Sequence, residues 1–520
     1  WGIVVESAVA VRRLKPHSIF RQLFFQAWCI SSVFWLIQTH WIWQPVAGAF
    51  VLWCCGSAGL ALCFAVFIVV AAKLRFQGAS LIVVLPALWI VLEWWRKHVF
   101  LGGFPYAALE HTQTGWLALI QCADLAGEGA VSGVMCVAGG WAATGLYAAM
   151  SPNPVPRSPW FAHGPILVTT TCAILAIPYG WIRLGELQEV EVANGQRPAR
   201  IALIQTMALL VQDHPKSDVA VAYDQAIELG RSVHDIDLMV WPESTFPGPF
   251  LWIAQDYQPV EWRSQPPELT RAMMNGLRVN AERPYRELAQ ACRAPVLVGT
   301  NTRLLELEAS DPRLLNSALL VDTEQNRIQR IDKERLAPLF ECDIGLWMIG
   351  CDLFSRSTYR PRDSSRLLQV RTRNLSSTAD GHSTDVPVAI SICYEGTSGP
   401  WINSQMRRLD LSGMKPAAMI NLSNNAIPSS IQLPKLHLTS LTFRAIEQRT
   451  PLLVATNAGL SAWIDATGKL RAVGHPGIPD IVIAEVRNES HSSGYRLWGD
   501  WLPLAAIGLL LIDLATRWLR

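Results

Sequence analysis

Long apolar stretches separated by short polar loops fill the first third of the chain. Runs long enough to cross a bilayer, which needs about twenty residues, lie near 22–41, 45–72, 79–95, 128–150 and 162–184, with another near 500–517. Residues 1–11 read as the end of an earlier helix, and because the first residue is Trp1 we expect a piece to be missing before it. Buried helices of a soluble protein are the alternative, but six such runs would leave no polar surface. The pattern therefore predicts a multi-pass helical membrane domain.

After residue 199 the pattern changes to short β-rich runs alternating with helical stretches. Strands are predicted at 200–205, 237–242, 296–300, 317–322, 326–331, 387–392, 417–421, 452–456, 460–464 and 481–485, and helices at 217–234, 282–293 and 434–449. Such alternation is typical of an α/β domain. We therefore expect three regions: a transmembrane helical domain at 1–190, an α/β domain at 199–490, and a C-terminal transmembrane helix at 498–520.

Composition supports the membrane assignment and excludes some functions. Half of the residues are hydrophobic and only 17% are charged, against about a quarter in soluble domains. A net charge of +2 argues against a nucleic-acid partner. The eleven cysteines include no CxxC pair and no His/Cys spacing suited to zinc, so neither a metal nor a cofactor is expected. Cys342 and Cys351 are close in sequence, and a disulfide between them stays open.

The basic residues of the loops predict the orientation of the spans. Those expected on the cytoplasmic side are Arg12, Arg13, Lys15, Lys73, Arg75, Arg157, Arg517 and Arg520. The loop at 41–46 on the opposite side contains none. Arg96 and Lys97 disagree with this assignment, because they begin an outside loop. Most of the pattern places the polar region 190–498 on the outer side of the membrane.

The candidate chemistry begins at residues 388–395, where an apolar β-branched run ends in Cys393. Two other strand ends carry reactive residues: the run 238–243 ends in Glu243, and 328–333 ends in Lys333. Strand ends are where α/β folds build sites. Glu243 could take the thiol proton, and Lys333 could favour the thiolate and stabilise an oxyanion, together with the N–H of Tyr394. Each residue alone has a structural explanation, but three at strand ends favour a catalytic set.

Three motifs carry a resemblance to a known family. They are Trp241-Pro242-Glu243-Ser244, Asp332-Lys333 with Leu336-Ala337-Pro338 and Glu341, and Ile392-Cys393-Tyr394-Glu395. The chain resembles the nitrilase (carbon–nitrogen hydrolase) superfamily and, within it, the apolipoprotein N-acyltransferase family. Further similar segments are 421–426 (Asn-Leu-Ser-Asn-Asn-Ala), His437 with 444–447 (Arg-Ala-Ile-Glu), and 451–459. The resemblance covers nearly the whole chain.

The resemblance implies an αββα sandwich and a catalytic set of Glu243, Lys333 and Cys393. Glu341 is implied to orient Lys333 or relay a proton, while Tyr394 and Glu395 are implied to shape the pocket. His437, Arg444 and Glu447 are expected to be structural, with the last two able to pair on one helix. Segment 99–127, through its Gly102–Tyr106 part, is either a loop near the site mouth or an interfacial connector.

The implied activity is N-acylation in a bacterial inner membrane, with the catalytic domain facing the periplasm. A phospholipid would give its acyl chain to Cys393 as a thioester, and the N-terminal α-amine of a diacylglyceryl-modified apolipoprotein would take it. The bilayer is required because both substrates carry acyl chains. A membrane-anchored nitrilase-type amidase and a catalytically silent scaffold in lipoprotein sorting are the alternatives.

Two segments depart from the family pattern, at 206–214 and at 427–429, and they affect substrate contacts more than the catalytic set. Two stretches, 248–281 and 353–385, are predicted to be long inserted loops. We expect the first to be a mobile arm that touches lipid. The second, rich in arginine, is either a lipid-phosphate contact or a solvated loop. Glu93, near the end of a span, is expected at the membrane interface because of Arg96 and Lys97.

Overall fold

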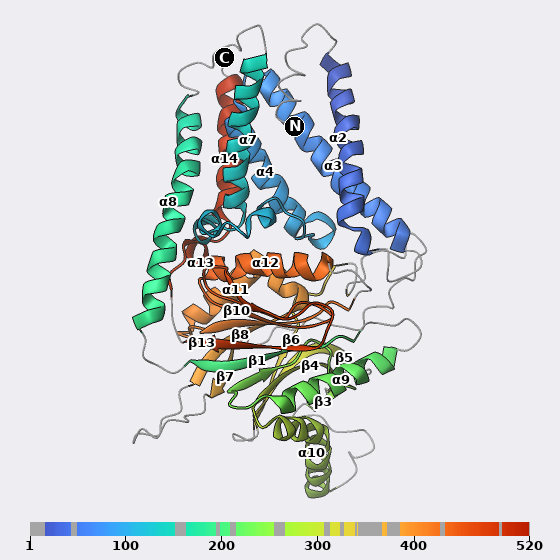
Figure 1. The fold of residues 1–520 in the computed structure, drawn as a ribbon. Helices are drawn as coiled ribbons and strands as arrows, with labels where there is room; N and C mark the ends of the chain where they lie inside the picture. Colours follow the sequence, from blue (N-terminus) through green and yellow to red (C-terminus); the bar gives the residue numbers. More distant parts are fainter. Residues whose placement is uncertain are drawn as a thin grey trace. The chain divides into compact units, whose positions relative to one another are not determined.

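The computed structural model divides the chain into two compact units. It describes residues 16–42, 49–150, 163–193, 198–208, 215–253, 266–305, 313–322, 327–338, 341, 367–371, 385–426, 432–487 and 491–518. The first unit, here called the helical unit, comprises residues 1–194, 446–449 and 492–520; the second, the sandwich unit, comprises 195–445 and 450–491 (Figure 1).

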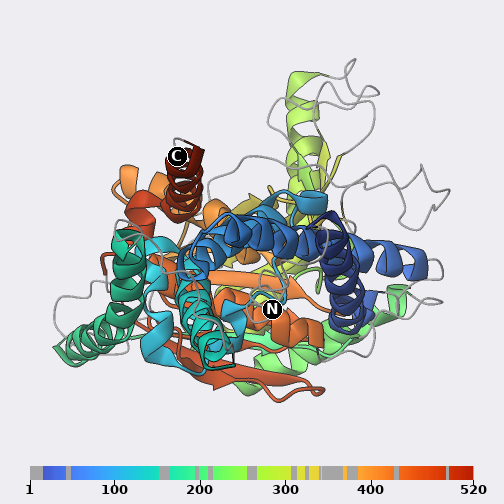
Figure 2. The same cartoon turned by 90° about the horizontal axis from the view of Figure 1, so that it is seen from above.

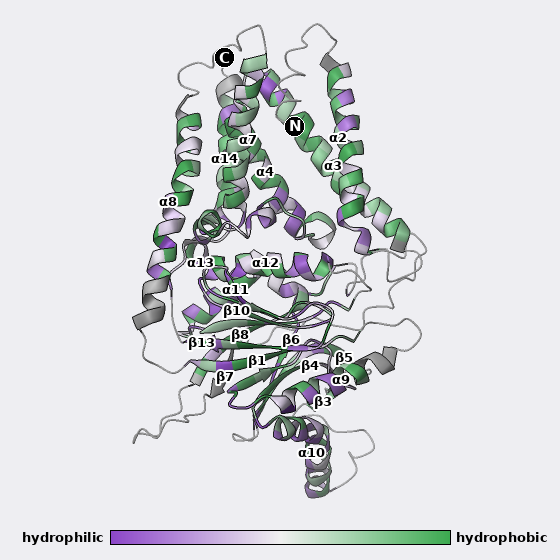
Figure 3. Ribbon diagram, in the orientation of Figure 1, coloured by the Kyte–Doolittle hydropathy of each residue, from purple (hydrophilic) through white to green (hydrophobic). Residues whose placement is uncertain are grey.

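The helical unit is built from long helices that expose apolar side chains. Its long helices are α2 (Pro16–Gln38), α3 (Ala49–Phe76), α4 (Leu81–His98), α7 (Gly129–Met150), α8 (His163–Ala193) and α14 (Trp501–Trp518). Figure 3 shows hydrophobic colour along most of α3 and α7. Large apolar side chains that a soluble protein would bury are exposed, for example Phe34, Leu62, Ile174 and Trp181. Such faces suit a lipid environment.

Three of the six predicted spans meet the length and hydropathy of a membrane-crossing helix within the described residues. Among the described residues, helices long and apolar enough to cross a membrane are Phe50–Phe76, Gly129–Met150 and Gly164–Leu187. The predicted runs near 22–41, 79–95 and 500–517 are also helical, and Trp501–Ala515 of α14 is apolar. In α2 the polar Arg21 and several glutamines lower the hydropathy. In α4 the charged residues of the last two turns do so.

Segment 99–127 forms short helices: η2 (Phe100–Gly102), η3 (Glu110–Gln113), α5 (Leu117–Ile120) and α6 (Ala123–Ala126). A buried arginine fixes its first part. Arg96 donates to the carbonyls of Phe104 and Tyr106, at 2.7 and 2.8 Å, and makes a two-point ion pair with Glu93. Neutralising Glu93 in this way offsets the cost of burying its charge.

The sandwich unit contains two facing β-sheets. The first has the order β13-β1-β2-β4-β5-β6, with β3 also beside β4, and the second has the order β12-β11-β10-β9-β8-β7. The strands of the first sheet are β1 (Ala199–Gln205), β2 (Leu238–Val240), β3 (Phe250–Ile253), β4 (Val296–Leu305), β5 (Arg313–Asp322), β6 (Arg327–Asp332) and β13 (Asp480–Val486). Those of the second are β7 (Leu367–Arg371), β8 (Asp385–Ile392), β9 (Ala418–Asn424), β10 (Leu452–Asn457), β11 (Ala462–Ile464) and β12 (Leu470–Val473).

Helices cover the outer faces of both sheets, which confirms the αββα sandwich (Figure 1). An apolar core between the sheets joins residues such as Leu203 and Val240 to Ile390 and Leu422. Helices α9 (Pro215–Ser232) and α10 (Pro267–Cys292) pack on the first sheet. Helices α11 (Gly399–Leu411) and α12 (Gln432–Gln448) pack on the second. The last residues of α12 belong to the helical unit.

The expectation of two unstructured insertions is wrong for the parts that the structure describes. Within 248–281 lie β3 and the first half of α10, which projects beyond the sheet it covers (Figure 2). Helix α10 begins at Pro267, fifteen residues before the predicted start at 282, and a proline is well suited to the first helical turn. Within 353–385 lies β7, paired with β8. Residues 254–265, the rest of 353–385, and Cys342 with Cys351 lie outside the described residues.

Candidate active site

Several parallel strands end at the same edge of the sandwich unit, and the candidate residues lie there. In the second sheet β8, β9 and β10 run parallel, so their carboxyl ends share an edge. Cys393 directly follows β8, and Glu243 comes three residues after β2, which is parallel to β1. Lys333 directly follows β6. Strand ends therefore deliver all three predicted side chains to one region, as the sequence pattern indicated.

Glu243 and Lys333 are in direct contact and almost fully buried. The ammonium Nζ of Lys333 lies 3.0 Å from Glu243 Oε1 and 2.8 Å from Glu341 Oε1. Glu341 Oε2 in turn accepts the N–H of Ala337 at 2.6 Å, which anchors the loop after Lys333. Lys333 is 1% exposed. One buried cation is thus held by two carboxylates, an arrangement that keeps it charged.

Asn316, on β5, belongs to this cluster and was not predicted from the sequence. Its side-chain Nδ2 donates to Glu243 Oε1 at 2.6 Å, and its main-chain carbonyl accepts the main-chain N–H of Lys333 at 2.8 Å. The one available signal was an asparagine inside the apolar stretch Leu314–Leu320, because Asn is depleted from strand interiors.

Cys393 occupies a strained turn that its neighbours hold in place. Its φ of 51° lies in the left-handed region, which costs a non-glycine residue roughly 1–2 kcal/mol. Glu395, fully buried, accepts the N–H of Ile392 at 2.8 Å and, with its other oxygen, the N–H of Glu334 at 2.6 Å. It therefore joins the nucleophile turn to the loop that carries Lys333. This role is more specific than the pocket-shaping role implied by the resemblance.

The surroundings of Cys393 keep its thiol protonated at rest. Burial raises the Cys393 pKa above its usual range, and the carboxylates of Glu243 and Glu341 raise it further. Lys333 and the N–H of Asn424 lower it, but not enough to reverse the shift. Lys333 therefore lowers the Cys393 pKa, as expected, but the net shift of that pKa is upward. A thiol of this kind needs a base that takes its proton during attack.

Lys333, in contrast to Cys393, is kept in its charged form by its surroundings. Burial alone would lower its pKa, but the charges of Glu243, Cys393 and Glu341 raise the Lys333 pKa well above its usual range. A raised pKa means that the ammonium persists at every pH where the protein would be assayed. A permanent positive charge beside the thiol is suited to stabilising an oxyanion.

Tyr394 directly follows the predicted nucleophile. Tyr394 is buried and stacks under the guanidinium of Arg335, 5.4 Å from the ring centre. Its N–H lies in the first turn of the short helix η7 (Cys393–Thr397), where N–H groups make no bond within the helix. Its role as an oxyanion donor stays a prediction.

His437 and Arg444 of α12 are buried in the sandwich unit. His437 Nδ1 lies 3.3 Å from Asn425 Oδ1, and burial and Lys333 lower its pKa to about 4. A neutral imidazole is expected at neutral pH. Arg444 donates to the carbonyl of Thr397 at 3.4 Å, while Glu447, in the helical unit, accepts the N–H of Glu128 at 2.9 Å. These contacts agree with structural roles.

Gly299→Ala should test how tightly Glu243 must be placed. A Cβ on Gly299, in β4, would lie 2.5 Å from both Glu243 Cα and the Pro242 carbonyl oxygen, so the backbone carrying Glu243 must move. Because a misplacement near 1 Å costs about 100-fold, we expect catalysis at this site to fall by up to that factor. Gly276→Ala, on α10 with nothing within 4 Å of the added carbon, is the control and should keep full activity. Equal rates in both variants would contradict the placement argument.

Lys333→Arg should retain the charge and lose the activity. A planar guanidinium cannot occupy the compact position between Glu243 and Glu341. We expect catalysis to fall about 10²–10³-fold, as on loss of an oxyanion donor. Lys469→Arg, at an exposed position, is the matched control. Rate measurements on both variants, with circular dichroism to check folding, test this; a near-normal rate for Lys333→Arg would exclude an oxyanion role for Lys333.

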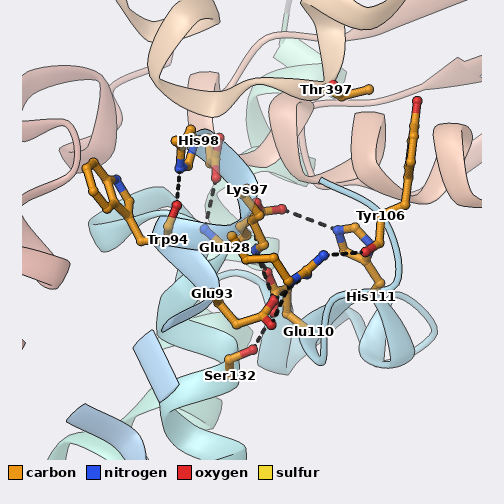
Figure 4. A network of polar contacts seen from close by, with 12 residues as sticks. Glu93, Trp94, Lys97, His98, Tyr106, Glu110, His111, Glu128, Ser132 and Thr397 are labelled. Carbon is orange, nitrogen blue, oxygen red and sulfur yellow. Dashed lines mark hydrogen bonds and ion pairs between the residues drawn. The ribbon is translucent and has the colours of Figure 1, made fainter. Parts of the chain in front are cut away.

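A second charged cluster in the helical unit has the donors of a metal site but already contains a cation. Ligand atoms of Glu110, His111 and Glu128 lie within 4.8 Å of one another. Lys97, however, places its ammonium against Glu110 and, at 2.9 Å, against Glu128 (Figure 4). A buried ammonium between two carboxylates supplies the charge that a metal ion would bring.

Comparison with known proteins agrees with the strand-end site. A family model described as carbon–nitrogen hydrolase matches residues 200–493. The chain belongs to the carbon–nitrogen hydrolase family. A second model, described as the apolipoprotein N-acyltransferase N-terminal domain, matches residues 1–141. Together with the relatives below, these matches confirm the resemblance to apolipoprotein N-acyltransferases that the motifs indicated.

Curated relatives in this family align over most of the chain. An apolipoprotein N-acyltransferase of Geobacter metallireducens is 25% identical over 83% of this chain and 73% of the relative. Another, from Rhodopirellula baltica, is 24% identical over 97% of this chain and 90% of the relative. The solved structure of Saccharomyces cerevisiae Nit3, a nitrilase-superfamily member, covers 56% of this chain and 90% of its own at 14% identity. Its TM-score of 0.36 is too low for an argument from shape.

Proposed function

We propose that this chain transfers an acyl chain from a phospholipid to the N-terminal α-amine of a diacylglyceryl-modified apolipoprotein. The observation that carries the proposal is the pairing of two family matches, a carbon–nitrogen hydrolase domain and an apolipoprotein N-acyltransferase N-terminal domain, on one chain. The apolar helices support it, because both substrates have acyl chains that do not leave a bilayer readily.

In the first half-reaction the Cys393 sulfur attacks an ester carbonyl of the phospholipid. The thiol proton goes to Glu243, and the C–O bond to the glycerol oxygen breaks as the thioester forms. Glu243 then gives the proton to the leaving oxygen, so that a lysophospholipid departs. Lys333 and the N–H of Tyr394 stabilise the oxyanion between these events. The raised thiol pKa supports a proton transfer that accompanies attack.

In the second half-reaction the acceptor amine attacks the thioester. Glu243 takes a proton from the neutral amine and gives it to the sulfur as the C–S bond breaks, so that the thiol is restored and the amide product leaves. Glu341 keeps Lys333 in place through the 2.8 Å ion pair, and Glu395 keeps the two loops together. The reaction is therefore of ping-pong type.

We place the chain in the bacterial inner membrane with the sandwich unit facing the periplasm. The placement rests on the basic loop residues and on the family of the relatives. The domain limits proposed are those predicted from the sequence: 1–190, 199–490 and 498–520.

The test is transfer between defined lipids. Purified chain is mixed with a phospholipid of known acyl length and a synthetic diacylglyceryl-cysteine peptide, and products are read by mass spectrometry. We expect equal amounts of N-acylated peptide and lysophospholipid. Free fatty acid without acylated peptide, or ammonia from small amides, would support the amidase alternative instead. No turnover with any of these substrates would support the alternative of a catalytically silent scaffold in lipoprotein sorting.

A further inference from the structure

One backbone N–H contacts the proposed base and affects the proposed nucleophile. The amide of Asn424, the last residue of β9, donates to Glu243 Oε2 at 3.0 Å. The same N–H lowers the pKa of the Cys393 thiol. A donor in this position affects the proton transfer between the two residues, because it stabilises negative charge on either of them.

The position of Asn424 is set by Asn457, at the end of β10. Asn457 Nδ2 donates to Asn424 Oδ1 at 3.1 Å and to the Ala208 carbonyl at 2.8 Å. Its Oδ1 accepts from the Thr206 hydroxyl at 2.8 Å and from the Ala208 N–H at 3.0 Å. Two donors and two acceptors are all that an asparagine side chain offers. Each of these is used, in a side chain that is 6% exposed.

These contacts join three strand ends at the site. Asn457 is directly opposite Asn424 in the pairing of β10 with β9, and its main-chain oxygen accepts the N–H of Asn425 at 2.9 Å. An isolated bridge between Asn457 and Thr206 links the second sheet to the end of β1 in the first. The turn 206–208, which departs from the family pattern, is therefore held by the same side chain.

We propose that Asn457 is a positioning residue that holds the Asn424 N–H against Glu243, and so controls proton transfer between Glu243 and the Cys393 thiol. The proposal rests on the proposed function for the roles of Cys393 and Glu243. It differs from a purely structural role, in which Asn457 would hold the sheets together without affecting the thiol.

Asn457→Asp separates these two roles. The substitution keeps the shape and the acceptor for Thr206 and Ala208, but it replaces the donor to Asn424 with an oxygen, which repels Asn424 Oδ1. The readout is alkylation by iodoacetamide, in which the thiolate forms an S–C bond and iodide leaves. The purified full chain is treated across a pH series, and the peptide containing Cys393 is quantified by mass spectrometry.

We expect the midpoint of the alkylation profile to move up by about one pH unit, which is about tenfold slower labelling at a fixed pH below it. Asn424→Ala, which adds no charge, should give a similar shift, and the double variant should add little, because both changes release the same amide. A shift seen only in Asn457→Asp would come from the charge of the new carboxylate and would contradict the proposal. Asp237→Ala is the control for lost stability. Asp237 is equally buried but accepts the N–H of Arg200 at the opposite ends of β1 and β2.

An unshifted profile in Asn457→Asp, or an equal shift in Asp237→Ala, would overturn the proposal. Failure of the proposed function would be distinguishable from failure of the role of Asn457. If the wild-type chain acquires no acyl group from phospholipid while Asn457→Asp still shifts the alkylation profile, Asn457 tunes the thiol but the acyl-transfer reading is wrong. If acylation is normal and the profile is unshifted, only the role of Asn457 is lost.

Discussion

Cys393→Ala should reduce N-acyl transfer to the level measured without enzyme. The proposed mechanism has one nucleophile, and alanine removes the sulfur while keeping the Cβ that packs against the core between the sheets. Folding should survive, so the thermal midpoint should change by a few degrees at most. The measurement is mass spectrometry of the lipopeptide acceptor after incubation with phospholipid.

Cys292→Ala is the matched control for this substitution. Cys292 ends α10 in the same unit, is 3% exposed, and has a pKa raised to about 11 by burial. An unreactive buried thiol of this kind should be dispensable, so the variant should keep its transfer activity after allowance for lost stability. Transfer that persists in Cys393→Ala would contradict the assignment of the nucleophile.

Glu243→Gln should lower transfer by about 10²–10⁴-fold, the range usual for a lost general base. The amide has the same shape, but it cannot take the thiol proton. The substitution also removes a negative charge that raises the Cys393 pKa, so the thiol should become more acidic. Slower transfer together with an alkylation midpoint at lower pH is therefore the expected pair of results.

The thermal midpoint distinguishes loss of the base from a collapsed site, because both would slow transfer and lower the thiol pKa. A collapsed or unfolded site would slow transfer and return the thiol to an ordinary pKa with loss of thermal stability. If Glu243→Gln transferred acyl groups at near the wild-type rate, proton transfer would have to occur elsewhere. Glu341 would be the next candidate, because it contacts the same lysine at 2.8 Å.

The sandwich could be predicted from the sequence because most of its strands are continuous apolar runs. These runs mark β1, β4, β8 and β10 directly, and their predicted limits differ from the observed ones by a few residues. Helix α11 and strands β3, β7 and β12 were missed. Strand β7 is a short edge strand in an arginine-rich stretch, and its pairing with β8 is a long-range property that local pattern does not carry.

The candidate site was partly predictable for the same reason. Glu243, Lys333 and Cys393 each end an apolar run, which made them visible without a structure. Asn316 lies within a strand, and its contact with Glu243 spans 73 residues of sequence. Glu395 was visible as part of a motif, but its bond to the N–H of Glu334, 61 residues away, was not. Hydropathy made all six apolar runs visible, although α2 and α4 carry polar groups within them.

The central claim is that Cys393 carries the acyl group, and intact mass after incubation with phospholipid alone tests it most directly. Without an acceptor the wild-type chain should gain the mass of one acyl chain, and that mass should disappear on adding hydroxylamine or the lipopeptide. Cys393→Ala should never gain it. No adduct on the wild-type chain, or a stable adduct on the Cys393→Ala chain at Cys342 or Cys351, would contradict the account.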